Sequence, residues 1–463
     1  MVGFVKNAER QNENRFWKYN ITFNFWASYC FFYRNVLANA CSNKWEMVLM
    51  KILAIDNGLY VPQIEALSDG GKNEVIYYSP WGKPFPSIED KMKGYGYGNI
   101  KKDLWFFNHV LSSDCICNFD VSNNDLIAYL REAHPEKSVF GAGRGEKLEH
   151  DRVFLKQWLE HYNLPVGPYK VLKGITNLSN YLKKNPGKYV KTNIFRDDTE
   201  SFFFTSWEDD EEIINERAVT LGIFKETEVF VVEDPIEAAC QSGVDMFFGN
   251  GNFIPFSWGF EISKNLCINK VALDLDEYPE CLRNNFEPLA PLMKRMDYRG
   301  AVSTEDRVVS KDESYLIDFT ARLPAPMGQM YPVFINNWSE LIYKIGKNED
   351  VEVECDYNYI GSFALSSEHA LTHNLKMKVD PKDYDKVRFQ MVGQDKDKVY
   401  SIKGNSVVCC LVAGGKTPQE VLKKLKEASK CVDAFSLDKD PVEAIEKQFE
   451  DALKGLNKVG IKF

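Results

Sequence analysis

The sequence lacks any long run of lysine or arginine, and its formal net charge is −10 at pH 7. Proteins that bind nucleic acid without sequence preference concentrate positive charge on one surface. This charge balance therefore argues against such a function, although it permits a local basic cleft. Low-complexity segments and internal repeats are absent as well. We expect no nucleic-acid partner.

A membrane-spanning run and a signal peptide are also missing. The aromatic stretch from 23 to 33 is interrupted by Asn24 and ended by Arg34, so it is too short for a membrane helix. It also lacks the small-residue cleavage pattern that follows a basic start in a signal peptide. We therefore expect a cytoplasmic protein without a membrane partner.

Cysteine is present, but not in the pattern of a disulfide framework. The count of eleven is odd and the spacing is irregular, so we interpret the cysteines as reduced and cytosolic. Cys115, Cys117, Cys409 and Cys410 lie in apolar, strand-like runs, and their spacing matches no zinc pattern. Buried core positions are expected for them, and the six histidines form no visible ligand set.

What the sequence does contain is typical of a large globular protein, with 44% hydrophobic, 27% charged and 13% aromatic residues. Such a chain can bury a sizeable core, and its length favours two to four domains. Residues 1–49 differ from the rest and are interpreted as an extension, or as the result of a misplaced start. The expected domains are an N-terminal α/β domain at 50–140, a central domain at 141–345 and a small C-terminal α/β domain at 346–463.

Strand-like and helical runs alternate in the first domain, which predicts a mostly parallel sheet. The first strand opens after Met50 and runs into Asn57-Gly58, a turn that can receive a ligand, but G-x-G-x-x-G is absent. Asn123 is a candidate cap for a helix at 124–132. Later elements expected from periodicity are a helix at 146–162, a strand at 224–232, a hairpin around 249–251, a helix at 285–296, strands at 351–355, 398–402 and 407–412, and helices at 418–429 and 441–456.

The most informative stretch runs from Tyr315 to Arg322. Asp318, Thr320 and Arg322 stand at every second position, so on a strand their side chains project the same way. A preceding strand and a turn at 311–314 predict a hairpin that brings Glu305 close to Asp318. Two carboxylates and a hydroxyl suit Mg²⁺, which proteins bind through one or two carboxylates plus substrate phosphates. The alternative is a solvated strand face with an ordinary ion pair.

From Met50 onward the order of motifs resembles phosphoribosylamine–glycine ligase, a member of the ATP-grasp superfamily. The matching segments are Ser138–Gly141, Glu146–Glu149, Phe154 and Lys156, Leu164-Pro165, Tyr189–Lys191, Val231–Glu233, Gln241–Asp245, Ile317–Arg322 and Ser406–Thr417. The resemblance implies an α/β protein with the ATP-grasp fold, an N-terminal parallel-sheet domain and a small C-terminal domain. It also implies ATP and Mg²⁺ as cofactors.

The resemblance assigns roles to particular residues. It makes Glu305, Asp318 and Thr320 the ligands of Mg²⁺, and Arg322 the catalytic residue that stabilises negative charge. ATP carries about four negative charges, which a site must neutralise with cations. The implied nucleotide-binding residues are Arg152, Lys191, Glu233, Gln241 and Lys264. For each, an ordinary surface or strand-end residue is the alternative.

Two departures from the family stand out. Where the family has a flexible glycine-rich phosphate loop, this chain has Asn193–Ser201 without a glycine, and a loop without glycine approaches phosphates poorly through its backbone. Arg196, Thr199 or Ser201 can supply side-chain donors instead. The family's substrate segment is replaced by Glu261–Lys270, which puts the family's own substrates in doubt.

We therefore predict a ligase that joins a small-molecule carboxylate to an amine through an acyl-phosphate, as a monomer or homodimer. A first alternative is a non-catalytic ATP-grasp-like nucleotide-binding protein. A second is a true phosphoribosylamine–glycine ligase of purine biosynthesis.

Overall fold

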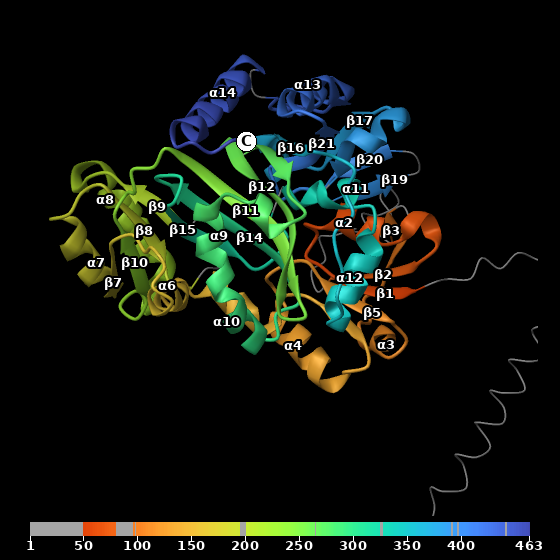
Figure 1. The fold of residues 1–463 in the computed structure, drawn as a ribbon, viewed down its shortest axis with the longest axis horizontal. Coiled ribbons are helices and arrows are strands. Elements are labelled where there is room, and N and C mark those ends of the chain that lie inside the picture. Colours follow the sequence, from red (N-terminus) through yellow and green to blue (C-terminus); the bar gives the residue numbers. More distant parts are fainter. Residues whose placement is uncertain are drawn as a thin grey trace, which may run out of the picture. The chain divides into compact units, whose positions relative to one another are not determined.

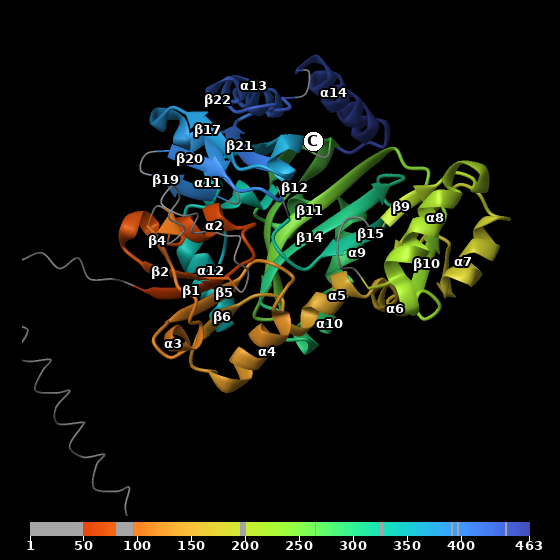
Figure 2. The same ribbon diagram turned by 180° about the vertical axis from the view of Figure 1, so that it is seen from behind.

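A computed structural model of the protein describes residues 50–79, 96–97, 99–194, 201–263, 265–324, 327–389, 392–395, 398–439 and 442–463. The stretch Val48–Phe463 is one compact unit, and the description below concerns this unit alone. Its strands form four sheets, which Figures 1 and 2 show from opposite sides.

The first sheet is built from the N-terminal part of the unit, in the strand order β3-β4-β2-β1-β5-β6. Its strands are β1 (Lys51–Ile55), β2 (Glu74–Tyr78), β3 (Gly96–Tyr97), β4 (Ile100–Lys102), β5 (Cys115–Asn118) and β6 (Ser138–Phe140). All neighbours pair in parallel except β3 with β4, which confirms the predicted mostly parallel sheet. Its helices are α2 (Val61–Ala66), α3 (Phe107–Val110) and α4 (Asn124–Ala133). Asn123 takes the cap position of α4 with φ of 68°, but its side chain makes no cap hydrogen bond.

The second sheet is antiparallel and has the order β7-β10-β8-β9. Its strands are β7 (Tyr169–Lys173), β8 (Lys188–Thr192), β9 (Ser201–Phe204) and β10 (Val229–Glu233). Helices α7 (Ile175–Leu182) and α8 (Trp207–Leu221) pack against alternate residues of β10, Phe230 and Val232, in a separate hydrophobic core. The opposite face of the sheet is therefore left to face the rest of the unit.

The third sheet is the largest, with the order β15-β14-β11-β12-β13-β16-β21-β18 and antiparallel pairing throughout. Its strands are β11 (Cys240–Gly249), β12 (Asn252–Ser263), β13 (Leu266–Val271), β14 (Gly300–Val308), β15 (Ser314–Thr320), β16 (Tyr359–Ser366), β18 (Val387–Phe389) and β21 (Val407–Gly415). Asn250 and Gly251 both have positive φ, 49° and 78°, so the predicted hairpin between β11 and β12 is confirmed.

The C-terminal part of the unit contributes to the third sheet and also forms a fourth. Its small sheet has the order β19-β20-β17-β22, from strands β17 (Leu375–Val379), β19 (Val392–Asp395), β20 (Lys398–Ser401) and β22 (Val432–Asp433). Helices α13 (Pro418–Ala428) and α14 (Val442–Lys458) follow the predicted positions. The expected boundary at 345 falls inside α12 (Trp338–Lys347), and the division into domains stays a prediction.

Four sequence-based expectations are corrected. The strand expected at 224–232 is the shorter β10, which begins at Val229, and Gly222–Phe224 form a 3₁₀ turn before it. The helix expected at 146–162 is two helices, α5 (Lys147–His150) and α6 (Arg152–His161), because Asp151 is extended and its carboxylate caps α6 by accepting from the amide of Phe154. The helix expected at 285–296 is broken into α9 (Glu280–Phe286), a 3₁₀ turn and α10 (Ala290–Arg295), with Pro288 and Pro291 at the starts of the last two.

The strand expected at 351–355 does not form, although its valines and glutamates alternate. Its backbone bonds instead to a loop: the Glu354 amide donates to Asn337 Oδ1, and the Asn336 amide donates to the Glu354 carbonyl. Alternation alone cannot show that a strand has no neighbour to pair with.

Candidate functional site

The hairpin of β14 and β15 has the register that the sequence predicts. Glu305 lies directly opposite Asp318, and Ser303 lies opposite Thr320. A bulge between Glu305 and Asp306 leaves Ile317 without a partner on β14. The strand ends at Thr320, so Arg322 follows the strand and does not continue its alternation as expected.

Lys191 joins the second sheet to the third. Its Nζ lies 3.2 Å and 3.3 Å from the two carboxylate oxygens of Asp318 on β15, and 3.3 Å from Glu233 Oε2 on β10. Lys156, on α6, lies 2.5 Å from the other oxygen of Glu233. Two lysines and two carboxylates thus alternate across the face of the second sheet that α7 and α8 leave uncovered.

The charges in this network depend on one another. Burial alone would lower the pKa of Lys191, but the carboxylates of Asp318 and Glu233 outweigh burial and raise it. Burial alone would raise the pKa of Glu233, but Lys191 and Lys156 outweigh burial and lower it. Lys191 and Glu233 are therefore both held in their charged forms, and each can pair with an oppositely charged group of a ligand.

Arg322 is fixed by groups from three parts of the chain. Its Nε lies 3.0 Å from Glu149 Oε1 on α5, and its Nη1 lies 3.3 Å from the carbonyl of Leu323 and 3.5 Å from the Tyr60 hydroxyl. The second oxygen of Glu149 accepts from the backbone amide of Ala321 at 2.7 Å. The guanidinium is thereby held in one place after the strand ends.

Three cavities meet at this hairpin, and Glu305 lines all of them. Cavity 1 has a volume of about 180 Å³, cavity 2 about 250 Å³ and cavity 3 about 420 Å³. Cavity 2 is the most highly charged, with Arg152, Lys156, Lys191, Glu233, Asp318 and Arg322 in its wall. Cavity 3 shares the lysines, Glu233 and Leu316 with cavity 2, and adds the apolar surfaces of Tyr189, Phe203 and Ile236.

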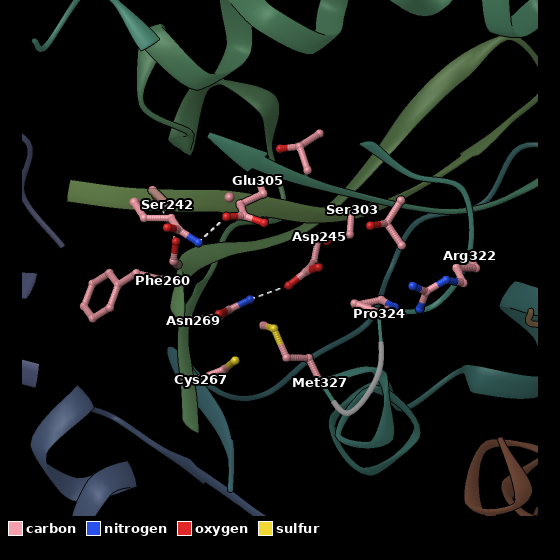
Figure 3. Close-up of a pocket in the computed structure, with 15 residues that line it drawn as sticks. Ser242, Asp245, Phe260, Cys267, Asn269, Ser303, Glu305, Arg322, Pro324 and Met327 are labelled. Atoms are coloured by element: carbon pink, nitrogen blue, oxygen red, sulfur yellow. Dashed lines mark hydrogen bonds between the residues drawn. The ribbon is translucent and has the colours of Figure 1, made fainter. Parts of the chain in front are cut away.

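Cavity 1 lies on the side of the hairpin toward β11, β12 and β13, and Figure 3 shows its lining. The carboxyl group of Asp245 stands in the wall between Asn269 and Ser303, while Arg322 and Phe260 lie at opposite sides of the view. Gln241 donates through Nε2 to Glu305 Oε1. Gly243 and Gly259 also line it, and side chains there would meet neighbouring backbone within 2.0 Å and 2.3 Å.

The remaining nucleotide-binding candidates are placed as follows. Arg152 lines cavity 2, donating through Nη1 to the Thr192 carbonyl at 2.5 Å and through Nη2 to Ser201 Oγ at 3.3 Å. Gln241 lines cavity 1 and neither of the cavities that contain Glu233. Lys264 and the segment with Arg196 and Thr199 lie outside the described residues.

Sequence reasoning missed Lys156, Glu149 and Tyr60 as members of the site. Lys156 is four residues after Arg152, which puts both on one face of a helix, and this spacing was the available signal. No local pattern marks Glu149 or Tyr60, because both act on a residue more than 170 positions away in the sequence.

The four cysteines in the strand-like runs take the core positions that the sequence predicts. Cys115, Cys117, Cys409 and Cys410 are all buried. Within the described ranges, no three acidic, histidine or cysteine side chains are grouped as a metal cluster. A divalent ion at the hairpin would thus need ligands from its substrate. None of the helices seen here has the length and apolar character that crossing a membrane requires.

No protein-family model matches this sequence, and no curated protein matches it. Solved structures do match. Phosphoribosylamine–glycine ligase from Thermotoga maritima aligns with a TM-score of 0.63 and 14% identity over 84% of this chain and 98% of that one. The biotin carboxylase domain of 2-oxoglutarate carboxylase from Hydrogenobacter thermophilus, in complex with MgADP, ADP and bicarbonate, gives 0.62 and 14% over 89% and 98%. L-Amino acid ligase from Bacillus licheniformis gives 0.56 and 12% over 84% and 99%.

At such identities the likeness concerns the fold and not the activity. The predicted resemblance is confirmed at this level: the chain has the mixed α/β ATP-grasp fold.

Proposed function

We propose that the protein is an ATP- and Mg²⁺-dependent carboxylate–amine ligase. One observation supports this above all others. Glu305 and Asp318 are directly paired across the hairpin, and Lys191 reaches Asp318 from the second sheet at 3.2 Å. Carboxylates for a metal and a buried cation for phosphate thus meet where the three cavities join.

The donor set fits the metal and the nucleotide. Glu305, Asp318 and Thr320 would supply three oxygen ligands, and Mg²⁺ when bound neutralises charge on the phosphates. Lys191 and Arg152 would neutralise the phosphates further. The apolar wall of cavity 3 suits a planar base, with Glu233 to accept from an amino group. The MgADP complex of the biotin carboxylase domain supports this assignment.

The reaction class joins an acid to an amine while ATP is converted to ADP and phosphate. In this chain the residues mainly position groups and balance charge. Arg322, which lines cavities 1 and 2, would stabilise the negative charge that develops on the transferring group. Its contacts with Glu149 and Tyr60 would hold the guanidinium in position for this role.

Calorimetry of Mg²⁺-ATP binding tests the metal and nucleotide site without knowledge of the substrate. Asp318→Asn removes one anionic ligand but keeps the shape, so it should weaken Mg²⁺-dependent binding. Asp312→Asn, on the exposed tip of the same hairpin, is the matched control and should bind as the wild type does. If Asp318→Asn binds Mg²⁺-ATP as tightly as the wild type, the hairpin is not the metal site.

Phosphate release from ATP in the presence of acids and amines tests the catalysis itself. Release that depends on both an acid and an amine supports the ligase. Tight Mg²⁺-ATP binding with no dependence on any pair would instead favour the non-catalytic nucleotide-binding protein, which the absence of glycine from Asn193–Ser201 supports. Complementation of a purine auxotroph would identify a true phosphoribosylamine–glycine ligase.

A further inference from the structure

Residues 351–355 have the side-chain pattern of a strand but no strand beside them. Valines and glutamates alternate there, and so does their exposure, since Val353 is 6% exposed whereas Glu352 and Glu354 are exposed. No strand of the described residues pairs with this segment. A stretch with the pattern of a strand and an open edge can pair with a strand from another chain.

One edge of the segment is bonded and the other is open. The Glu352 carbonyl accepts from Asn337 Nδ2 at 2.9 Å, and Glu354 bonds through both its amide and its carbonyl to the same loop. In an extended chain the backbone groups of neighbouring residues point to opposite sides, so those of Val351 and Val353 point away from this loop. Neither valine has a backbone hydrogen-bond partner among the described residues.

A cavity of about 400 Å³, here called cavity 4, lies against this segment. Its other walls are the turn end of the β11–β12 hairpin and residues 273–275. Phe253 and Ile254 are 9% and 7% exposed and Leu273 is 41% exposed, so these walls offer apolar surface. Since β13 pairs with β12 only from Ser257 onward, no described strand covers the second edge of β12 at the cavity.

The charged side chains around cavity 4 are all of one sign. Asp274, Glu349, Asp350 and Glu352 line it, and its described lining residues include no lysine, arginine or histidine. Asp350 accepts from Asn250 Nδ2 at 2.8 Å, and because this donor is neutral the negative charge remains. The walls therefore favour an incoming segment that combines apolar side chains with positive charge.

We propose that cavity 4 is a docking site for an extended segment of a partner protein, in which apolar residues alternate with lysine or arginine. The backbone of that segment pairs with the open edge at Val351 and Val353. Its apolar side chains pack on Phe253 and Leu273, and its basic side chains meet the acidic residues of the walls. Cavity 4 shares no lining residue with cavities 1 to 3, so docking there does not depend on the ligase reaction.

Matched peptides test this assignment. The labelled probe Lys-Val-Lys-Val-Lys-Val-Lys is compared with a peptide in which glutamate replaces lysine, one in which serine replaces valine, and one whose backbone is N-methylated at alternate residues. Binding to the full chain is measured by fluorescence anisotropy at low and at high salt. We expect the probe to bind in the micromolar range, more weakly at high salt, and each control peptide to bind at least about ten-fold more weakly than the probe.

Charge variants locate the binding on the protein. Glu349→Gln combined with Glu352→Gln should weaken binding of the probe by about three- to ten-fold, because two acidic residues of the cavity lose their charge. Glu354→Gln combined with Asp356→Asn is the matched control. It removes as much charge from the same segment but outside cavity 4, and should leave the affinity for the probe unchanged.

Leu273→Ser tests the apolar wall and should also weaken binding, whereas Leu371→Ser, at a similarly exposed position outside the cavity, should not. The proposal is overturned if the probe does not bind, if any control peptide binds as well as the probe, or if the charge variant of cavity 4 keeps full affinity. It is also overturned if affinity for the probe falls as the protein concentration rises, because a second copy of the chain then occupies the cavity.

Discussion

The Lys191 side chain connects two sheets, because its ammonium group contacts Glu233 on the second sheet and Asp318 on the third. Replacement by methionine keeps the apolar stem and removes the charge. We expect ATP affinity to fall about ten- to hundred-fold, because one charge-assisted contact contributes about 1.5–3 kcal/mol. Lys188→Met, on the same strand but paired with Asp234, should bind ATP normally in calorimetry. Equal losses in both variants would count against a direct phosphate contact.

Arg322 and Glu149 form a second test at this scale. Arg322→Met alone should lower the free energy of unfolding by about 3 kcal/mol, because the 8%-exposed carboxylate of Glu149 loses its partner. Adding Glu149→Gln should recover most of this stability in urea unfolding, since the uncompensated charge is gone. Turnover should stay lost in both, as the guanidinium is absent. Recovery of turnover in the double variant would show that Arg322 takes no part in the reaction.

Among the elements, β11 and β14 approach so closely that a glycine is required. A Cβ on Gly243 would lie 2.0 Å from the Thr304 carbonyl, next to Glu305. Gly243→Ala should therefore cost about 2–4 kcal/mol and displace β14. Gly249→Ala, on the same strand, has its nearest contact at 3.3 Å, with Ile345 Cγ2, and should cost less than about 1 kcal/mol. Urea unfolding of the two variants compares them, and similar costs would contradict the close approach.

The carboxyl end of β1 makes a pH-dependent contribution to stability. Burial raises the pKa of Asp56 from 3.8 to about 6, although Tyr77 donates to it at 2.8 Å. Between these values the folded protein binds more protons than the unfolded chain, so stability falls as pH rises and the loss is complete above about pH 6. Asp56→Asn should thus gain up to about 3 kcal/mol relative to wild type between pH 4 and pH 7. Urea unfolding at both pH values measures it; a difference that does not change with pH would contradict the assignment.

At the scale of the whole molecule, the fold is expected to need nothing before Met50. The Met50 carbonyl already accepts from the Glu74 amide at 2.9 Å, and β1 starts at the next residue. A shortened protein that begins at Met50 should be soluble and keep its melting temperature. One that begins at Asp56 lacks β1, which pairs with both β2 and β5, and should not fold. A clearly lower melting temperature of the first would show that residues 1–49 stabilise the fold.

The sequence by itself determined the elements that short-range periodicity encodes. The parallel first sheet, the hairpin at Asn250-Gly251 and the facing of Glu305 and Asp318 all follow from side-chain alternation and turn residues within a few tens of positions. The order of the family-like motifs indicated the fold, because these motifs are spread from Ser138 to Thr417. The alternation at 351–355 wrongly predicted a strand, because alternation does not show whether a neighbouring strand is there to pair with.

The tertiary structure alone decided which charges meet. Lys191 and Asp318 are 127 positions apart, and Glu149 and Arg322 are 173 apart, so no local pattern links them. The physical reason is that burial, pairing and cavity walls depend on what packs against a residue from distant parts of the chain, whereas periodicity reports only which way its own side chain points.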